Sequence, residues 1–325
     1  MKFYFLNKLY IKIKNKFIKK NNVVNLCLNR YKRKYKRVDT KNTIIRTYRK
    51  KIISKIFLLG PKESYSYIVG SNYIKNYYKN SIIKLCSTFK EIIKKTENEK
   101  ESFAILPIEN TNSGSIYEVY DLLINSKLYI LKEFNMKINH CLLSKKRTNI
   151  NKIKFLYSHY QPFKQCNEFI KKFKKVKIVN TNSTSEAMKT ISKIKSPIVA
   201  AIGSLSGSKF YDLLVVKKNI NNKNNITKFI LLSNTYNKNE VDNARILIFM
   251  INFKSKKYRV INIIFIINKY KIKIDKLENR IFYNNKSQEV LYVNIKNNFN
   301  FTILKKMLDE IKKESNYIRF MGYFI

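Results

Sequence analysis

The sequence has few acidic residues, few glycines and prolines, and no tryptophan. Its 21 Asp and Glu stand against 67 Lys and Arg, a formal net charge of +46, and its 325 residues include 6 Gly and 4 Pro. Such a basic chain suggests nucleic acid or an anionic membrane as a partner. However, its lysines run almost evenly from Lys2 to Lys313 instead of gathering on one arm or helix. With the excess of Asn, Ile, Tyr and Phe, this spread is typical of an AT-rich genome, so we expect no nucleic-acid partner.

The sequence also lacks long apolar runs and paired cysteines. The apolar stretch Val260–Ile267 is much shorter than the roughly 18 residues of a membrane span, so we expect no membrane segment. Four cysteines without a CxxC pair exclude a disulfide framework and fit a reducing compartment. Neither His140–Cys141 nor His159 with Cys166 has the spacing of a zinc site. The first 38 residues contain no acid but also no Ser, and they show no cleavage site, so we expect a cytoplasmic protein without metal or cofactor.

The sequence divides into three regions that differ in composition. Residues 1–54 are rich in Lys and Asn with scattered apolar positions, which suggests one or two short amphipathic helices. Residues 55–235 hold all four prolines and five of the six glycines. Residues 244–325 form a third unit after the polar linker Asn234–Asn243. Because 45% of the residues are hydrophobic, the chain can bury a sizeable core.

The middle region alternates apolar strands with helical stretches. Strands are expected at residues 56–59, 103–108, 154–157 and 197–202, each followed by a polar turn that leads toward a helix. This pattern predicts an α/β fold whose site lies at the carboxyl ends of the strands.

The last region predicts a βαββαβ unit of the ferredoxin-like kind. Its strands are expected at residues 245–252, 273–282, 288–295 and 317–325, and its helices at 258–268 and 302–314.

Four polar clusters stand out from the Lys- and Asn-rich background. Read from the sequence, they are Gly60–Ser66 (GPKESYS), Leu106–Ser115 (LPIENTNSGS), Tyr157–Cys166 (YSHYQPFKQC) with Ser183–Ala187 (STSEA), and Asn225–Phe229 (NITKF).

In this order and spacing the clusters resemble the prephenate dehydratases, most closely the dehydratase part of the bacterial bifunctional chorismate mutase–prephenate dehydratases. The resemblance covers about residues 55–325. It implies a two-lobed α/β dehydratase domain with its active site in the cleft, followed by a regulatory domain of the ACT type. It also implies prephenate as substrate, which loses water and carbon dioxide to give phenylpyruvate in phenylalanine synthesis.

The resemblance assigns roles to individual residues. Thr227 would donate to the departing hydroxyl, while Glu109 and Asn110 would serve acid catalysis and substrate orientation. Lys228 would supply the counter-charge to the substrate. The other substrate-binding candidates are Ser64, Tyr65, Ser158, Gln165, Ser183 and Thr184.

Structural roles stay open for several of these residues. Ser183 and Thr184 also suit an ordinary helix N-cap, because Ser183 and Glu186 have capping-box spacing. Glu109 could cap the following helix. His159 suits a structural role better than that of a base, because the reaction abstracts no proton from carbon.

Three positions depart from the family pattern. Lys228 stands where the family has Arg and loses its bidentate fork. Glu63 replaces a glycine, and Tyr160 replaces a proline. We expect a slower enzyme with weaker substrate binding.

The C-terminal unit resembles a phenylalanine-binding ACT domain with eroded motifs. The family's Gly-Ala-Leu turn falls on Tyr258, Arg259 and Val260, and its Glu-Ser-Arg-Pro falls on Glu278, Asn279, Arg280 and Ile281. Because a tyrosine would fill the space that a ligand needs, we predict weak or absent feedback inhibition by phenylalanine. The domain would persist for homodimer formation.

Other functions remain open. Residues 1–54 occupy the place of a chorismate mutase but contain no Glu or Gln, which disfavours that activity. Arogenate dehydratase uses the same scaffold. A basic nucleic-acid-binding protein on an inactive scaffold is the alternative of a different class, and steep salt-dependent binding would reveal it.

Overall fold

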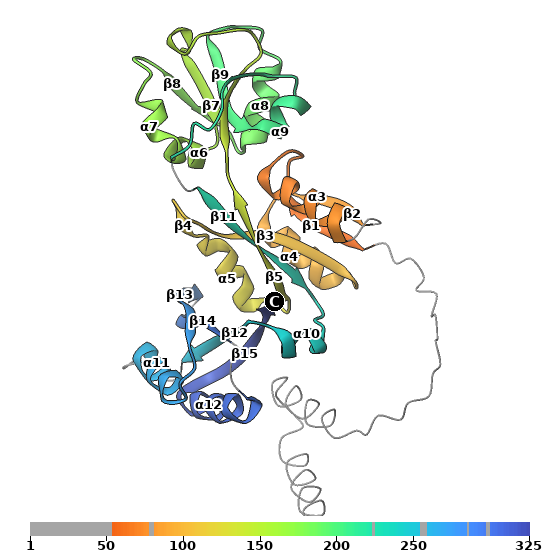
Figure 1. Cartoon of the computed structure of the whole chain (residues 1–325), viewed down its shortest axis with the longest axis vertical. Helices are drawn as coiled ribbons and strands as arrows, with labels where there is room; N and C mark the ends of the chain where they lie inside the picture. The colour runs from red at the N-terminus through yellow and green to blue at the C-terminus, as the bar shows by residue number, and fades with distance from the viewer. Residues whose placement is uncertain (1–53, 78–80, 223–224, 254–258, 285, 297–299) are drawn as a thin grey trace, which may run out of the picture. The chain divides into compact units, whose positions relative to one another are not determined.

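The computed structural model describes residues 54–77, 81–222, 225–253, 259–284, 286–296 and 300–325 (Figure 1). The helices predicted before residue 54 lie outside this range. Backbone contacts divide the described chain into two compact units that meet between Tyr236 and Asn237.

The larger unit contains two sheets. The first has the strand order β5-β11-β3-β1-β2, with β4 beside β3. Its strands are β1 (Lys55–Leu59), β2 (Ile82–Cys86), β3 (Ser102–Asn110), β4 (Gly114–Ser115), β5 (Tyr129–Lys137) and β11 (Ile226–Ser233). Its helices are α3 (Tyr65–Tyr77), α4 (Phe89–Asn98) and α5 (Tyr117–Asn125). Strand β1 is parallel to β2 and β3, whereas β11 is antiparallel to β3 and β5.

Helix α3 packs closely on this sheet. Val69 and Tyr73 join the buried cluster of Ile56, Leu58 and Phe229. Gly70 permits the approach, because a Cβ at this position would lie 2.3 Å from Leu58 Cδ1. The middle of α3 is therefore fixed against β1.

The second sheet has the order β10-β6-β9-β7-β8. Its strands are β6 (His140–Ser144), β7 (Phe155–Ser158), β8 (Lys177–Asn180), β9 (Val199–Ser204) and β10 (Leu214–Lys217). The short helices around it are η1 (Ile150–Lys152), α6 (Tyr160–Gln165), α7 (Asn167–Ile170), α8 (Thr184–Ser192) and α9 (Leu205–Phe210). Apolar clusters lie on both faces of the sheet: Leu142 and Leu156 belong to one, and Leu143 and Met188 belong to the other.

The second sheet is an insertion into the first. The chain leaves the first sheet after β5, builds β6 to β10, and returns as β11, which pairs with β5 along eight residues. Figure 1 shows β5 and β11 running from one sheet toward the other. The returning strand β11 thereby places its first residues where the two sheets meet.

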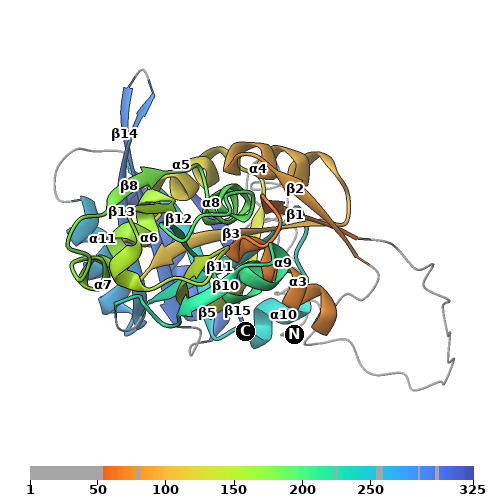
Figure 2. The same ribbon diagram turned by 90° about the horizontal axis from the view of Figure 1, so that it is seen from above.

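The smaller unit follows the βαββαβ order. It consists of α10 (Lys238–Asn243), β12 (Ile246–Phe253), α11 (Arg259–Lys269), β13 (Ile274–Asn284), β14 (Lys286–Lys296), α12 (Phe301–Glu314) and β15 (Ser315–Phe324). Within this unit the strand order is β13-β14-β12-β15, all antiparallel. The β13–β14 ribbon extends past the rest of this sheet (Figure 2).

The structure confirms the mixed α/β class and the ferredoxin-like element order. The predicted strands at residues 56–59, 103–108, 154–157 and 197–202 correspond to β1, β3, β7 and β9. The boundary between the two units falls inside the expected polar linker at residues 234–243, which also contains the short helix α10. Asn237 caps this helix by accepting from Asn239 N, and Val241 is buried. In the described part of the chain, no helix has the length and apolar character to cross a bilayer.

Candidate active site

A buried network of polar side chains lies where the two sheets of the larger unit meet. Asn110 ends β3, and Asn225 and Thr227 stand at the beginning of β11. From the second sheet come Gln165, the last residue of α6, and His140, the first residue of β6. All five are at least 91% buried, so each polar group must find a protein partner or a ligand.

Asn110 is the centre of this network. Its Nδ2 donates to Thr227 Oγ1 at 2.8 Å and to Asn225 Oδ1 at 2.7 Å. Its Oδ1 accepts from the backbone N–H groups of Asn112 at 2.9 Å and Ser113 at 3.2 Å. One side chain thus joins the turn after β3 to the beginning of β11.

Gln165 connects this centre to the second sheet. Its Oε1 accepts from Asn225 Nδ2 at 3.0 Å and lies 2.8 Å from His140 Nε2. Its Nε2 makes a long contact of 3.5 Å to Asn110 Oδ1. On the far side, His140 Nδ1 lies 3.0 Å from the hydroxyl of Tyr65, at the start of α3.

Burial decides the protonation of these groups. It lowers the pKa of His140 to about 4, and the hydrogen bond with Gln165 opposes this only in part. Burial also raises the pKa of Tyr65 well above its usual value, and it raises the pKa of Cys166 to about 12. At neutral pH the imidazole, the phenol and the thiol are therefore all uncharged.

Glu109 and Lys228 lie away from this network. Their backbones pair across β3 and β11, next to the pair of Asn110 and Thr227. Because successive side chains of a strand point to opposite faces, the sheet separates the two pairs. Lys228 Nζ lies 3.8 Å from Glu109 Oε2 and 3.6 Å from Glu133 Oε1, all three partly exposed. The structure therefore does not bring Glu109 and Lys228 together with Thr227.

The predicted serines make local structural bonds. Ser158 Oγ donates to the Ile202 carbonyl, and Ser64 Oγ donates to the Leu59 carbonyl. Ser183 caps α8 by accepting from Glu186 N, as the capping-box spacing indicates, and Thr184 is the first residue of that helix. In its capping bond the Ser183 hydroxyl is the acceptor, so this bond does not use its own hydrogen.

The loop between β1 and α3 touches the second sheet. Ser185 Oγ, in the first turn of α8, donates to the Lys62 carbonyl at 2.6 Å and lies 2.8 Å from Tyr211 Oη. Glu63 in this loop has φ 67, the left-handed region that favours glycine. The departure from the family glycine at this position therefore falls on a strained backbone.

The eroded regulatory motifs lie on α11 and β13. Tyr258 lies outside the described residues, Arg259 begins α11, and Val260 is half-buried. On β13, Glu278 lies 3.7 Å from Lys276 Nζ, and Asn279 Nδ2 donates to Glu289.

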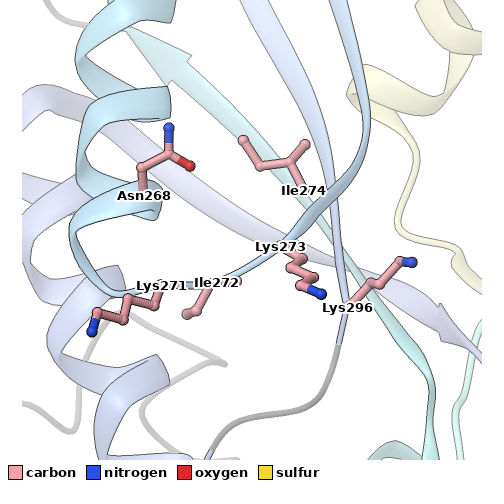
Figure 3. A pocket seen from close by; sticks show the side chains of 6 residues that line it. All are labelled: Asn268, Lys271, Ile272, Lys273, Ile274 and Lys296. Atoms are coloured by element: carbon pink, nitrogen blue, oxygen red, sulfur yellow. The ribbon is translucent and has the colours of Figure 1, made fainter.

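Two surface pockets of the smaller unit include none of these motif residues. A pocket of 480 Å³ is lined by Asn268, Lys271, Ile272, Lys273, Ile274 and Lys296. Its three lysines do not converge, because Lys271 points away from Lys273 and Lys296 (Figure 3). A second pocket of 570 Å³ lies between α11 and α12 and contains Phe265 and Glu310. In the second pocket, Lys269 and Tyr270 donate to the Glu310 carboxylate.

Within the described ranges, no group of three His, Cys, Asp or Glu side chains is arranged to hold a metal. Cys86, Cys141 and Cys166 are free and buried.

Sequence reasoning missed His140 and Asn225 as members of the site. Asn225 lies in the NITKF cluster, two residues from Thr227, so its place at the start of a strand was the available signal. In the sequence His140 stands out only beside Cys141, and no local pattern joins it to Gln165 or Tyr65.

Comparison with known proteins places these features in a family. A family model described as prephenate dehydratase matches residues 56–237. A bifunctional chorismate mutase/prephenate dehydratase of Buchnera aphidicola subsp. Schizaphis graminum is 40% identical over 275 residues, which cover 84% of this chain and 71% of that protein.

Solved structures share the fold. A prephenate dehydratase from Staphylococcus aureus gives a TM-score of 0.71 at 22% identity, covering 83% of this chain and all of that chain. A prephenate dehydratase from Arthrobacter aurescens in complex with L-phenylalanine gives 0.73 at 18% identity, covering 84% of this chain and 90% of that chain.

Proposed function

The chain belongs to the prephenate dehydratase family, and we propose that it converts prephenate to phenylpyruvate, carbon dioxide and water with Thr227 as the donor to the departing hydroxyl. The observation that carries this proposal is the hydrogen bond from Asn110 Nδ2 to Thr227 Oγ1. Because Thr227 accepts this bond, its own hydrogen is left for another acceptor.

The reaction suits such a site. The carbon–carbon bond to the ring carboxylate breaks, its electron pair enters the ring, and carbon dioxide leaves. The ring electrons then break the bond to the hydroxyl oxygen, which gains a proton and departs as water. Because aromatisation drives these steps, the protein has to hold the dianion in one geometry and stabilise the leaving oxygen.

Thr227 is placed for the second task. Among the described residues, Asn110 is the partner recorded for its hydroxyl, and the Thr227 side chain is nearly buried. A hydrogen bond donated in a poorly solvated site is stronger than the same bond in water. It therefore favours loss of the oxygen as negative charge develops on it.

Gln165 and Asn110 serve the first task in this proposal. The Gln165 carbonyl is occupied by two partners, which leaves its NH2 group to donate to a substrate carboxylate. Asn110 orients Thr227 through its amide. We include Ser183, whose hydroxyl hydrogen is unused in its capping bond, with Thr184 beside it at the N-terminus of α8. For Ser64, Tyr65 and Ser158, whose recorded bonds are internal, we propose that they shape the site around the substrate.

Roles for Glu109 and Lys228 in acid catalysis and charge neutralisation stay predictions. Their mutual ion pair and their position across the sheet from Thr227 favour an indirect contribution. If either touches the substrate, Glu109→Gln or Lys228→Gln will change kcat or KM by more than about tenfold. A smaller effect assigns the pair to the support of β11.

We further propose that the smaller unit is an ACT-type domain with weakened phenylalanine control and a homodimer contact. Its βαββαβ order and its antiparallel sheet support this assignment. Strand β13 is an end strand of that sheet within the unit, and such strands readily pair with another chain. Sedimentation of the purified protein tests for the dimer.

The experiment that tests the function is phenylpyruvate formation from prephenate, with and without phenylalanine, beside a Thr227→Ala control. Turnover that is lost in the control and unaffected by phenylalanine supports both proposals. Strong inhibition by phenylalanine overturns the weakened control alone. If folded protein gives no turnover, the dehydratase proposal fails, and arogenate conversion and salt-dependent nucleic-acid binding are measured next.

A further inference from the structure

The hydrogen-bond network around Asn110 has a fixed direction. A backbone N–H group can only donate, so the N–H groups of Asn112 and Ser113 require the oxygen of the Asn110 amide on their side. The NH2 group of Asn110 must then face Thr227 and Asn225, to which it donates.

The same order of donors and acceptors continues from Asn110 through Asn225 to Gln165. Because Asn225 Oδ1 accepts from Asn110, the Asn225 NH2 group faces Gln165 and donates to its Oε1. The atom of Gln165 that lies 2.8 Å from His140 Nε2 is therefore the amide oxygen. An oxygen cannot donate, so His140 Nε2 must carry the hydrogen of this bond.

The other ring nitrogen of His140, Nδ1, carries no hydrogen. His140 is neutral at pH 7, because burial lowers its pKa to about 4, and a neutral imidazole carries one N–H. With that hydrogen on Nε2, the Nδ1 atom accepts from the Tyr65 hydroxyl at 3.0 Å. The Tyr65 hydroxyl, which also lies 3.2 Å from the Asn139 carbonyl, can donate or accept, so it accommodates the tautomer that Gln165 requires.

We propose that His140, as the Nε2–H tautomer, is a positioning residue that orients the Gln165 amide toward the substrate. This inference rests on the proposed dehydratase function. Two donors, His140 Nε2 and Asn225 Nδ2, hold the Gln165 oxygen. The Gln165 nitrogen has only its 3.5 Å contact to Asn110 in the described chain, so it retains a hydrogen for a substrate carboxylate.

The expected effect is on substrate binding. Without the His140 donor, only Asn225 holds the Gln165 oxygen, and the amide rotates more freely. A carboxylate contact that is equally present in the bound substrate and in the transition state contributes to KM more than to kcat. Loss of the donor therefore raises KM by about tenfold, while kcat changes by less than about threefold.

Three variants separate positioning from mere stability. His140→Phe keeps a ring but removes both nitrogen atoms. His140→Gln can place an amide N–H near the former Nε2 position and is expected to restore KM to within about threefold of the parent. Cys141→Ala is the matched control, because Cys141 is the next residue of β6, is buried, and packs with Leu143 and Met188 on the other face. It lowers stability and leaves KM unchanged.

A double-mutant cycle tests whether His140 acts through Gln165. If it does, His140→Phe with Gln165→Leu raises KM no further than Gln165→Leu alone. Additive effects on KM, or a KM in His140→Phe equal to that of the parent, overturn the inference. The parent protein is assayed first: if it has no turnover, the proposed function has failed, whereas turnover without this coupling refutes the positioning role alone.

Discussion

The free energy of unfolding should depend on pH through the titration of His140. This contribution can be measured separately from those of the other titrating groups. The pKa of this residue falls from 6.5 to about 4 on folding, because its imidazole is buried. Between these values the unfolded chain binds a proton at this position and the folded chain does not, so stability rises with pH. The contribution of His140 to the free energy of unfolding is fully present above pH 6.5 and is lost as the pH falls toward 4. Below pH 4 it changes no further.

The magnitude follows from the shift. A change from 6.5 to about 4 corresponds to about 3 kcal/mol, at about 1.4 kcal/mol for each pKa unit. The groups around His140 do not titrate in this window: Tyr65, Cys141 and Cys166 all have raised pKa values and stay neutral. Gln165 and Asn221, which also bond to His140, carry no charge.

The measurement is urea unfolding followed by circular dichroism, because the chain has no tryptophan. The free energy of unfolding is compared between the parent and His140→Phe from pH 7 to pH 4. The carboxylates are the same in both proteins, so their contributions cancel when the value for His140→Phe is subtracted from that of the parent. This difference should fall by about 3 kcal/mol as the pH is lowered from 7 to 4. Parallel curves for the two proteins would show that folding does not change the pKa of His140, and the prediction would be refuted.

Three further predictions concern other parts of the larger unit. Thr227→Val should lower kcat by about 10²- to 10³-fold with an unchanged melting temperature, while Thr227→Ser retains most activity; equal losses in both would refute the donor role. The Asn110 amide keeps its bonds to Asn225 and to the Ile226 carbonyl in either variant, so the fold should survive. Glu63→Gly should raise the free energy of unfolding by about 0.5–1 kcal/mol, since it relieves φ 67; an unchanged urea midpoint would contradict this. Gly70→Ala should lower the free energy of unfolding by about 1–3 kcal/mol, because the new Cβ would lie 2.3 Å from Leu58. An unchanged free energy of unfolding would show that α3 can move away from β1.

Local patterns in the sequence predicted some of the elements around the site. Apolar runs that end at polar turns identified β1, β3, β7 and β9, and the spacing of Ser183 and Glu186 identified the cap of α8. Strands β5, β6 and β11 were not predicted, although β5 and β11 frame the site. In β5 and β11 lysine interrupts the apolar residues, as at Lys132 and Lys228, and the even spread of lysine through the chain hides the alternation that marks a strand.

By itself, the sequence determined the family, the mixed α/β class and the candidate residues, because ordered motifs survive even where the background composition has drifted. Only the tertiary structure decided which candidates meet. It joins Asn110 to Thr227 across 117 positions and places Gln165 between them and His140. It also separates Thr227 from Lys228, which are neighbours in the sequence, because adjacent residues of a strand face opposite sides of the sheet. The spacing of residues along the chain predicts neither the contact of Asn110 with Thr227 nor the separation of Thr227 from Lys228. Both arise from the pairing of β3 with β11 and from the return of the chain from the second sheet.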